Sequence, residues 1–173
     1  MKEDISENLI QIPESNLFVR FQDCDPFGHL NNARYIDYFL NTREEHTNTY
    51  YNLNLMEIAR EQGANWVVSQ HQISYLRPAD LGERIVVQTK LIHFDNSTIV
   101  LEGTVLNERK TQLKSLLWST MRFVNLQSGR PTDHSNELMD LLELLDVAEI
   151  DYDPDGFQER VKELNRQIKK QTS

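Results

Sequence analysis

The sequence predicts an α+β fold in which one curved antiparallel sheet of about five strands wraps around a long central helix. Three observations predict it. Apolar residues alternate over 16–23, helical spacing begins at Ala33, and four long segments rich in β-branched and aromatic residues follow residue 65. A chain of 173 residues is long enough for one domain with a proper core and short for two.

The first strand and the turn after it follow from residue type. Leu17, Val19 and Phe21 lie on one face at period two, which predicts a strand over 16–23. The run Asp25-Pro26-Phe27-Gly28 then has the residue preferences of a type I turn, with Asp first, Pro second and Gly fourth. The strand is therefore expected to lead into a tight turn.

The central helix is expected to begin at Asn31 or Asn32, because a short amide side chain accepts a hydrogen bond from an unpaired N–H of the first turn. Its apolar residues recur at helical spacing up to about Thr47: Ala33, Ile36, Phe39 and Leu40. A second, shorter helix is predicted over 55–62, with Gly63 ending it.

The four later segments are predicted to form an antiparallel meander of long strands: 66–77, 84–94, 98–107 and 112–126. Turn-prone residues separate them. A sheet of this size leaves an open edge, and pairing between subunits is a natural way to cover it.

Two helical stretches end the chain, over 136–145 and roughly 156–171. The last ~20 residues are polar, so this helix either docks on the domain or frays. We expect an N-terminal tail over 1–14, a folded domain over 15–145 and a C-terminal helical extension over 146–173.

Composition excludes several classes of partner. The net charge of −9 argues against nucleic acid and against an anionic membrane. Cys24 is the only cysteine, so an internal disulfide is impossible, and the histidines show no metal-site spacing. The acidic N-terminus lacks an apolar stretch of signal-peptide length, and a cytoplasmic protein without a bound metal is expected.

The run from Asp23 to Asn32 is the most informative part of the chain. It places a carboxylate, a tight turn and a helix N-terminus within a few residues of one another. Such a run can hold a general base or nucleophile beside a ready-made oxyanion site. An aspartate here, considered alone, is more often a turn residue.

Three consecutive runs carry a family resemblance: Arg20-Phe21-Gln22-Asp23-Cys24-Asp25, Pro26-Phe27-Gly28-His29-Leu30-Asn31-Asn32 and Arg34-Tyr35-Ile36-Asp37-Tyr38-Phe39. They resemble the acyl-CoA thioesterases of the hotdog fold, and most of all the 4-hydroxybenzoyl-CoA thioesterase-like group and its fatty acyl-CoA relatives. Residues 73–83 and 128–131 add to the resemblance, which covers about residues 15–145.

The resemblance implies that 15–145 is a hotdog thioesterase domain and that two sheets join edge to edge in a dimer, with active sites at the subunit boundary. It also implies that Asp25 is the catalytic carboxylate and that the N–H of Asn32 is the oxyanion donor. Glu83 departs from the family pattern, which usually has Asp there, and the chain beyond Leu145 has no counterpart in the family.

Thioester hydrolysis needs an attacking oxygen and stabilisation of the oxyanion, and the thiolate leaves readily. Asp25 would either attack the carbonyl or deprotonate a water, and the sequence leaves both routes open. The N–H groups of Asn32 and Ala33 would point at the carbonyl oxygen, aided by the helix dipole. No metal or redox cofactor is expected.

Three further residues are candidates for substrate binding. Gly28 would let the backbone approach the ligand, or it merely completes the turn. His29 contacts the substrate, hydrogen-bonds a carboxylate or stiffens the loop. Asn31 would cap the helix and so fix the donors in place. Cys24 is expected to pack rather than react, because adjacent side chains of an extended chain point to opposite faces.

The expected function is hydrolysis of a medium- to long-chain acyl-CoA to the free acid and CoA, by a homodimer or a dimer of dimers. Basic residues at the tunnel mouth would contact the CoA phosphates, and the candidates are Arg77, Arg84, Lys90 and Arg122. The alternatives are a thioesterase that acts on acyl carrier protein and a non-catalytic protein that binds acyl-CoA.

Overall fold

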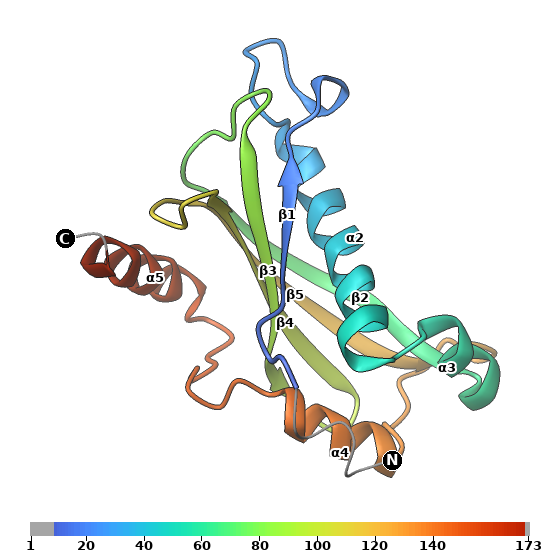
Figure 1. Cartoon of the computed structure of the whole chain (residues 1–173). Coiled ribbons are helices and arrows are strands. Elements are labelled where there is room, and N and C mark those ends of the chain that lie inside the picture. The colour runs from blue at the N-terminus through green and yellow to red at the C-terminus, as the bar shows by residue number, and fades with distance from the viewer. Residues whose placement is uncertain (1–8, 172–173) are drawn as a thin grey trace.

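In the computed structural model, which describes residues 9–171, a five-stranded antiparallel sheet wraps around helix α2, Asn32–Tyr51 (Figure 1). The strands are β1 Glu14–Phe18, β2 Ala64–Tyr75, β3 Arg84–Phe94, β4 Thr98–Asn107 and β5 Leu113–Asn125. Their order across the sheet is β1-β3-β4-β5-β2. The predicted α+β class, with a sheet of about five strands around a central helix, is confirmed.

One connection differs from the predicted meander. Strands β3, β4 and β5 pair in chain order, but β2 pairs with β5, from Ala64 opposite Asn125 to Tyr75 opposite Ser115. The segment 76–83 therefore crosses from β2, at one edge of the sheet, to β3, which lies next to β1 at the other edge. Alternation of residue types shows that a segment is a strand, but it does not show which strand lies beside it.

The first strand is shorter than predicted. It ends at Phe18, and Phe21–Asp23 form a single 3-10 turn. Val19 is fully buried, and its N–H and carbonyl still pair with Glu83 and Gly82, both at 3.0 Å. Phe21 is 82% exposed, so the alternating apolar residues of 16–23 share a buried face only as far as Val19.

Helix α2 begins where a capping asparagine was expected. Asn31 is the N-cap, and its side chain accepts a hydrogen bond from the N–H of Ala33. The helix runs to Tyr51, about one turn beyond the predicted end. Its buried face packs on the sheet, where the ring of Phe39 lies over Gly103 of β4. A Cβ at Gly103 would lie 2.4 Å from that ring, which explains a glycine within a strand.

Three shorter helices complete the chain: α3 Leu55–Gln62, α4 Asn136–Leu145 and α5 Phe157–Gln171. The bounds predicted for α3 and α4 are confirmed, and Gly63 ends α3 in the left-handed conformation. Between residues 9 and 171, no helix combines the length and the apolar character that a membrane crossing requires.

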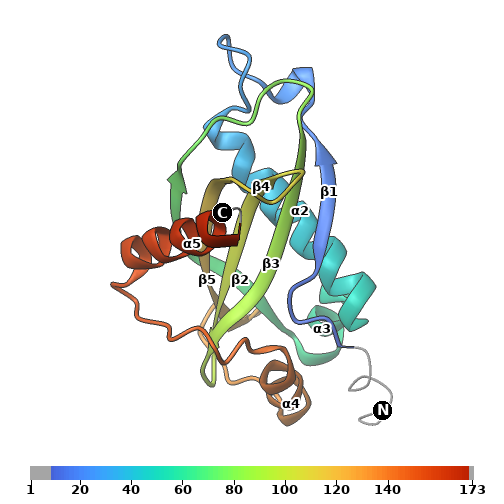
Figure 2. The same ribbon diagram turned by 60° about the vertical axis from the view of Figure 1, so that its left-hand side comes forward.

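Helix α5 lies across the face of the sheet that is opposite α2 (Figure 2). Phe157, Val161 and Leu164 are buried there against a cluster that includes Trp118 of β5. Of the two alternatives for the end of the chain, the structure shows the docked helix. The division into tail, domain and extension stays a prediction, and residues 1–8 of the tail lie outside the described part.

A buried ion-pair network fixes α5 to the sheet. Glu102 of β4 is fully buried and accepts hydrogen bonds from both Nε and Nη2 of Arg160, at 2.9 and 3.0 Å. Lys90 of β3 lies 3.0 Å from the same carboxylate, and Trp118 donates its indole N–H at 3.0 Å. Burial raises the pKa of Glu102, but the Arg160 hydrogen bond and the Lys90 charge outweigh it, so the pKa lies below its usual value.

Replacing Arg160 with Met is expected to lower the free energy of unfolding by about 3 kcal/mol, because a buried carboxylate loses its bidentate partner. Denaturation in urea measures this. The control is Lys162→Met on the same helix, whose ion pair with Glu159 is exposed and should contribute little. Equal stability of Arg160→Met and Lys162→Met would contradict the anchoring role of Arg160.

His134 makes folding stability depend on pH. Its Nε2 accepts the indole N–H of Trp66 at 2.9 Å, so this nitrogen carries no proton in the folded protein. Burial lowers the pKa of His134 below its ordinary value of 6.5, and the opposing effect of Asp95 is smaller. The unfolded chain therefore binds a proton more readily, and this contribution to stability is present above pH 6.5 and lost as pH falls.

We expect the urea midpoint to fall as pH is lowered from about 7.5 to about 5.5. A His134→Gln variant should be less stable near neutral pH and should show a shallower pH dependence. Burial also lowers the pKa of His46 and of His71, so part of the slope should remain. An unchanged slope in His134→Gln would rule out His134 as a contributor.

Candidate active site

Two segments that are far apart in the sequence hold each other at the start of α2. The turn after Cys24 and the segment 76–83 pair like short strands, with the N–H of Leu30 donating to Ala79 at 2.8 Å and that of Leu81 donating to Gly28 at 2.9 Å. The segment that crosses the sheet therefore fixes the position of the Asp25 turn.

The buried ammonium group of Lys114 on β5 holds this crossing segment in place. The ammonium group of Lys114 donates to the carbonyl of Pro78 at 2.6 Å and lies 2.8 Å from the carboxylate of Glu83. The other oxygen of Glu83 accepts the N–H of Asp80 at 2.9 Å. Glu83, the residue that departs from the family pattern, thus has a structural role in this chain.

Asp25 uses one carboxylate oxygen for the turn. Its Oδ1 accepts the N–H groups of Phe27 and His29 at 2.9 and 3.2 Å, and the N–H of Gly28 donates to its carbonyl at 3.0 Å. Gly28 has φ +78°, a backbone conformation that favours glycine. Oδ2 makes no hydrogen bond with any residue in 9–171, so one carboxylate oxygen stays available for chemistry.

The first turn of α2 offers one open donor. The N–H of Ala33 donates to the Asn31 side chain at 3.0 Å, and that of Arg34 donates to the Asn31 carbonyl at 2.8 Å. The N–H of Asn32 donates to no acceptor within the described residues. Ala33 as an oxyanion donor stays a prediction, but a ligand oxygen would have to compete with the cap for its N–H.

His29 lies beside a carboxylate other than that of Asp25. Its Nε2 is 3.5 Å from Oδ1 of Asp80, and both side chains are well exposed. The backbone of His29 closes the turn, because its carbonyl accepts the N–H of Asp25 at 2.8 Å. The side chain is therefore free to meet a ligand at the surface, and its role stays a prediction.

Asp23 and Cys24 have structural partners. Tyr38 donates its hydroxyl to Asp23 at 2.9 Å, and burial together with this hydrogen bond raises the pKa of Tyr38 to about 12. The thiol of Cys24 donates to the carbonyl of Arg20 at 3.3 Å. Desolvation and the charges of Asp23 and Asp25 raise the pKa of Cys24, which disfavours a nucleophilic thiolate.

Sequence reasoning missed Tyr75, although it lies within the segment 73–83 that carries the family resemblance. Its hydroxyl donates to the carbonyl of Asn32 at 2.9 Å, and its ring packs edge-on against Tyr35 with centroids 5.3 Å apart. Tyr75 therefore ties the end of β2 to the first residue of α2.

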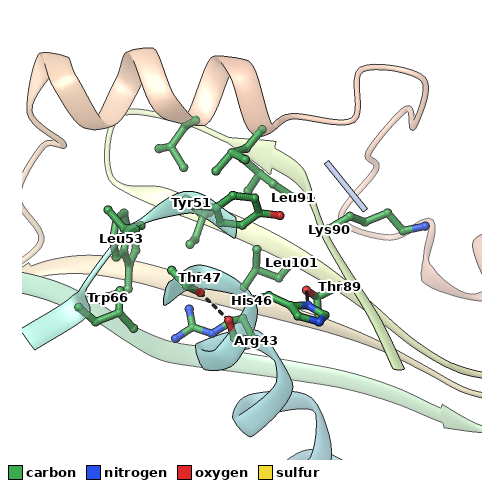
Figure 3. Close-up of a pocket in the computed structure, with 14 residues that line it drawn as sticks. Arg43, His46, Thr47, Tyr51, Leu53, Trp66, Thr89, Lys90, Leu91 and Leu101 are labelled. Carbon is green, nitrogen blue, oxygen red and sulfur yellow. Dashed lines mark hydrogen bonds between the residues drawn. The ribbon is translucent and has the colours of Figure 1, made fainter. Parts of the chain in front are cut away.

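An apolar cavity of about 60 Å³ lies under the other end of α2 (Figure 3). Side chains from α2, the sheet and α4 line it, among them His46, Tyr51, Trp66 and Leu142. A smaller cavity of about 20 Å³ beside Phe39 shares Arg43, Thr89 and Leu101 with it. The two form an interrupted path between α2 and the sheet.

Arg43 is a buried cation that lines both cavities of this path. Its Nη1 lies 3.4 Å from the sulfur of Met121, and its Nε is buried without a hydrogen-bond partner in the described chain. Burial lowers the pKa of Arg43. Apart from Arg43, His46 and the ion pair of Lys90 with Glu102, the path is bordered mainly by aliphatic and aromatic side chains.

A curved antiparallel sheet wrapped around one long central helix is the hotdog fold, and probable thioesterases are among the solved structures that share it. The chain belongs to the thioesterase-like superfamily, whose family model matches residues 19–142. The family resemblance that the sequence predicts is thereby confirmed.

Comparison with individual proteins agrees with this assignment. The acyl-CoA thioesterase YbgC of Haemophilus influenzae is 27% identical over 120 residues, which are 69% of this chain and 86% of that protein. The structure of YbaW, a probable thioesterase from Escherichia coli, has a TM-score of 0.67 at 22% identity. The match covers 76% of this chain and 97% of the YbaW chain. Slr0204, a 1,4-dihydroxy-2-naphthoyl-CoA thioesterase from Synechocystis, has a TM-score of 0.69 at 12% identity. The match covers 81% of this chain and 99% of Slr0204. The protein is a thioester hydrolase with a hotdog fold.

Proposed function

We propose that the protein hydrolyses the thioester of an acyl-CoA to the free acid and CoA, with Asp25 as the catalytic carboxylate. The observation that carries this proposal is the pair of open groups at the start of α2. One oxygen of Asp25 and the N–H of Asn32 are both without partners in the described chain, and hydrogen bonds hold the turn and the helix start together.

The chemistry follows from these two groups. The carbonyl oxygen of the thioester accepts the Asn32 N–H, and the positive end of the α2 dipole stabilises the oxyanion. Asp25 either takes a proton from the attacking water or attacks the carbonyl carbon itself. The C–S bond then breaks and CoA leaves as the thiolate. In the second route, water hydrolyses the resulting anhydride and restores Asp25.

The proposal extends to a medium- to long-chain acyl group. The path under α2 has an apolar lining, and α2 spans about 21 Å between Asn32 and His46 at 1.5 Å per residue. An acyl chain would have to be long to reach the cavity beside His46, and the side chains between the two cavities, Phe39 among them, would have to move.

We also propose a homodimer formed through β2. This strand is 12 residues long and pairs on one side only, with β5. Val67 and Val68 on it are 43% and 39% exposed. A long open edge with exposed β-branched residues favours pairing with another strand, and a second copy of β2 would satisfy its backbone groups.

The test is release of free thiol from acyl-CoA substrates of graded chain length, with the same acyl groups on acyl carrier protein in parallel. The proposal expects hydrolysis of the CoA thioesters with kcat/KM rising toward longer chains. Faster hydrolysis of the carrier-protein thioesters would instead favour the carrier-protein alternative. Saturable binding of acyl-CoA without thiol release would favour the non-catalytic alternative.

A further inference from the structure

A polar groove of about 630 Å³ is lined by residues that follow β2 and by residues of helix α5. Figure 2 shows the end of β2 beside this helix. Arg77, two residues beyond the end of β2, lines one side. The other side is lined by charged and polar residues of α5: Glu159, Lys162, Asn165, Arg166 and Lys169. Four cations and one carboxylate thus face a single groove, in a chain whose net charge is −9.

The other large groove near the site has the opposite balance. It measures about 600 Å³, lies between β1 and the exposed face of α2, and is lined by two arginines and three carboxylates: Arg20, Arg34, Asp23, Asp37 and Glu45. Its carboxylates would repel an anionic ligand. Of these two grooves, the one beside α5 is therefore the better site for phosphate groups.

The two arginines of the α5 groove are the strongest candidate ligands. Arg77 and Arg166 form no salt bridge with any carboxylate in residues 9–171, and Nε of Arg166 donates to the carbonyl of Lys162 at 3.3 Å. Guanidinium groups bind phosphate through two parallel hydrogen bonds. Lys162 instead lies 2.6 Å from Glu159, so the one carboxylate of the groove already has a partner.

Helix α5, which carries all the cations of the groove except Arg77, is fixed to the sheet. Arg160, on the same helix, is held by the buried Glu102, and Phe157 and Leu164 are buried against the sheet. A preorganised set of cations loses less entropy on binding than a mobile one. The helix lies outside residues 19–142, which the family model matches, whereas Arg77 lies within them.

The groove begins close to the proposed reaction site. Arg77 is two residues from Tyr75, about 7 Å of extended chain, and Tyr75 donates its hydroxyl to the carbonyl of Asn32 at 2.9 Å. In CoA the thioester and the phosphates lie at opposite ends of the pantetheine arm. We propose that the α5 groove binds the phosphates of the CoA nucleotide, an inference that rests on the proposed function.

The kinetic test compares an acyl-CoA with the matching acyl-pantetheine, which has the same thioester and no nucleotide. Arg77→Gln and Arg166→Gln should each raise KM for the acyl-CoA by about 3- to 10-fold and leave KM for the acyl-pantetheine unchanged. Glu159→Gln should lower KM for the acyl-CoA, since it removes the repelling charge. The matched control is Arg130→Gln, in the exposed turn after β5.

Direct binding separates failure of this inference from failure of the proposed function. Titration calorimetry with adenosine 3′,5′-bisphosphate should show binding to the wild type and weaker binding to Arg166→Gln, whether or not any thioester is cleaved. Hydrolysis of both substrates with no KM change in the arginine variants would overturn the inference and leave the proposed function standing. Variants that impair only carrier-protein thioesters would also overturn it.

Discussion

Asp25→Asn is expected to slow acyl-CoA hydrolysis by about 100- to 10,000-fold, the range that positioned general bases typically contribute. Asparagine keeps an oxygen that can accept the N–H groups of Phe27 and His29, so the turn should survive. The change removes only the negative charge of the open Oδ2 position. Thiol release under saturating acyl-CoA gives the loss in kcat.

The control is Asp23→Asn, two residues earlier, at the end of the 3-10 turn Phe21–Asp23. Its carboxylate accepts the hydroxyl of Tyr38, and an asparagine oxygen can do the same. We expect this variant to retain most of the activity. Circular dichroism and thermal unfolding should show that both variants fold. Near-normal turnover by a folded Asp25→Asn protein would remove Asp25 from the mechanism.

Asn32→Pro is expected to lower kcat by about 100- to 1,000-fold, the usual loss for one oxyanion-hole donor. Proline is tolerated at the first position of a helix, because the N–H that it lacks has no partner within the helix. Asn31 precedes it with φ −60° and ψ 135°, an extended conformation that suits a residue before proline. The substitution thus removes the open backbone donor with little cost to α2.

Asn32→Ala keeps the N–H and removes only the side chain, so it should retain activity. Both variants should keep the carbonyl that accepts the Tyr75 hydroxyl. Equal kcat values for the alanine and proline variants would show that the Asn32 N–H does not stabilise the oxyanion.

Much of the fold is predictable from local residue types. The bounds of α3 and α4 follow from a capping residue at one end and, for α3, a left-handed Gly63 at the other. Turn residues flank β3 and β4 at both ends, and the predicted bounds of these strands are also those of the structure. Where capping and turn residues flank an element, the sequence alone predicts its bounds.

Long-range pairing limits the prediction elsewhere. The alternation at 16–23 continues past the point where β1 ends, since Phe21 is apolar but faces solvent. The pairing of β2 with β5 depends on how the sheet closes around α2, and no local pattern in Ala64–Tyr75 encodes it. These are properties of tertiary structure.

The candidate site shows the same division. The turn at Asp25, the glycine at 28 and the cap at Asn31 are local and were predictable. Tyr75 and Asp80 reach the site only because the crossing segment packs against the turn, some 50 residues away. The N–H of Ala33 donates to the side chain of the N-cap residue Asn31, and residue types alone do not predict which N–H the cap binds.

The most direct test of the central claim is a crystal structure of Asp25→Asn with an intact acyl-CoA bound. The account predicts that the thioester carbonyl oxygen accepts a hydrogen bond from the Asn32 N–H, with the residue 25 side chain facing the carbonyl carbon. An acyl-CoA whose thioester lies away from the start of α2 would contradict it.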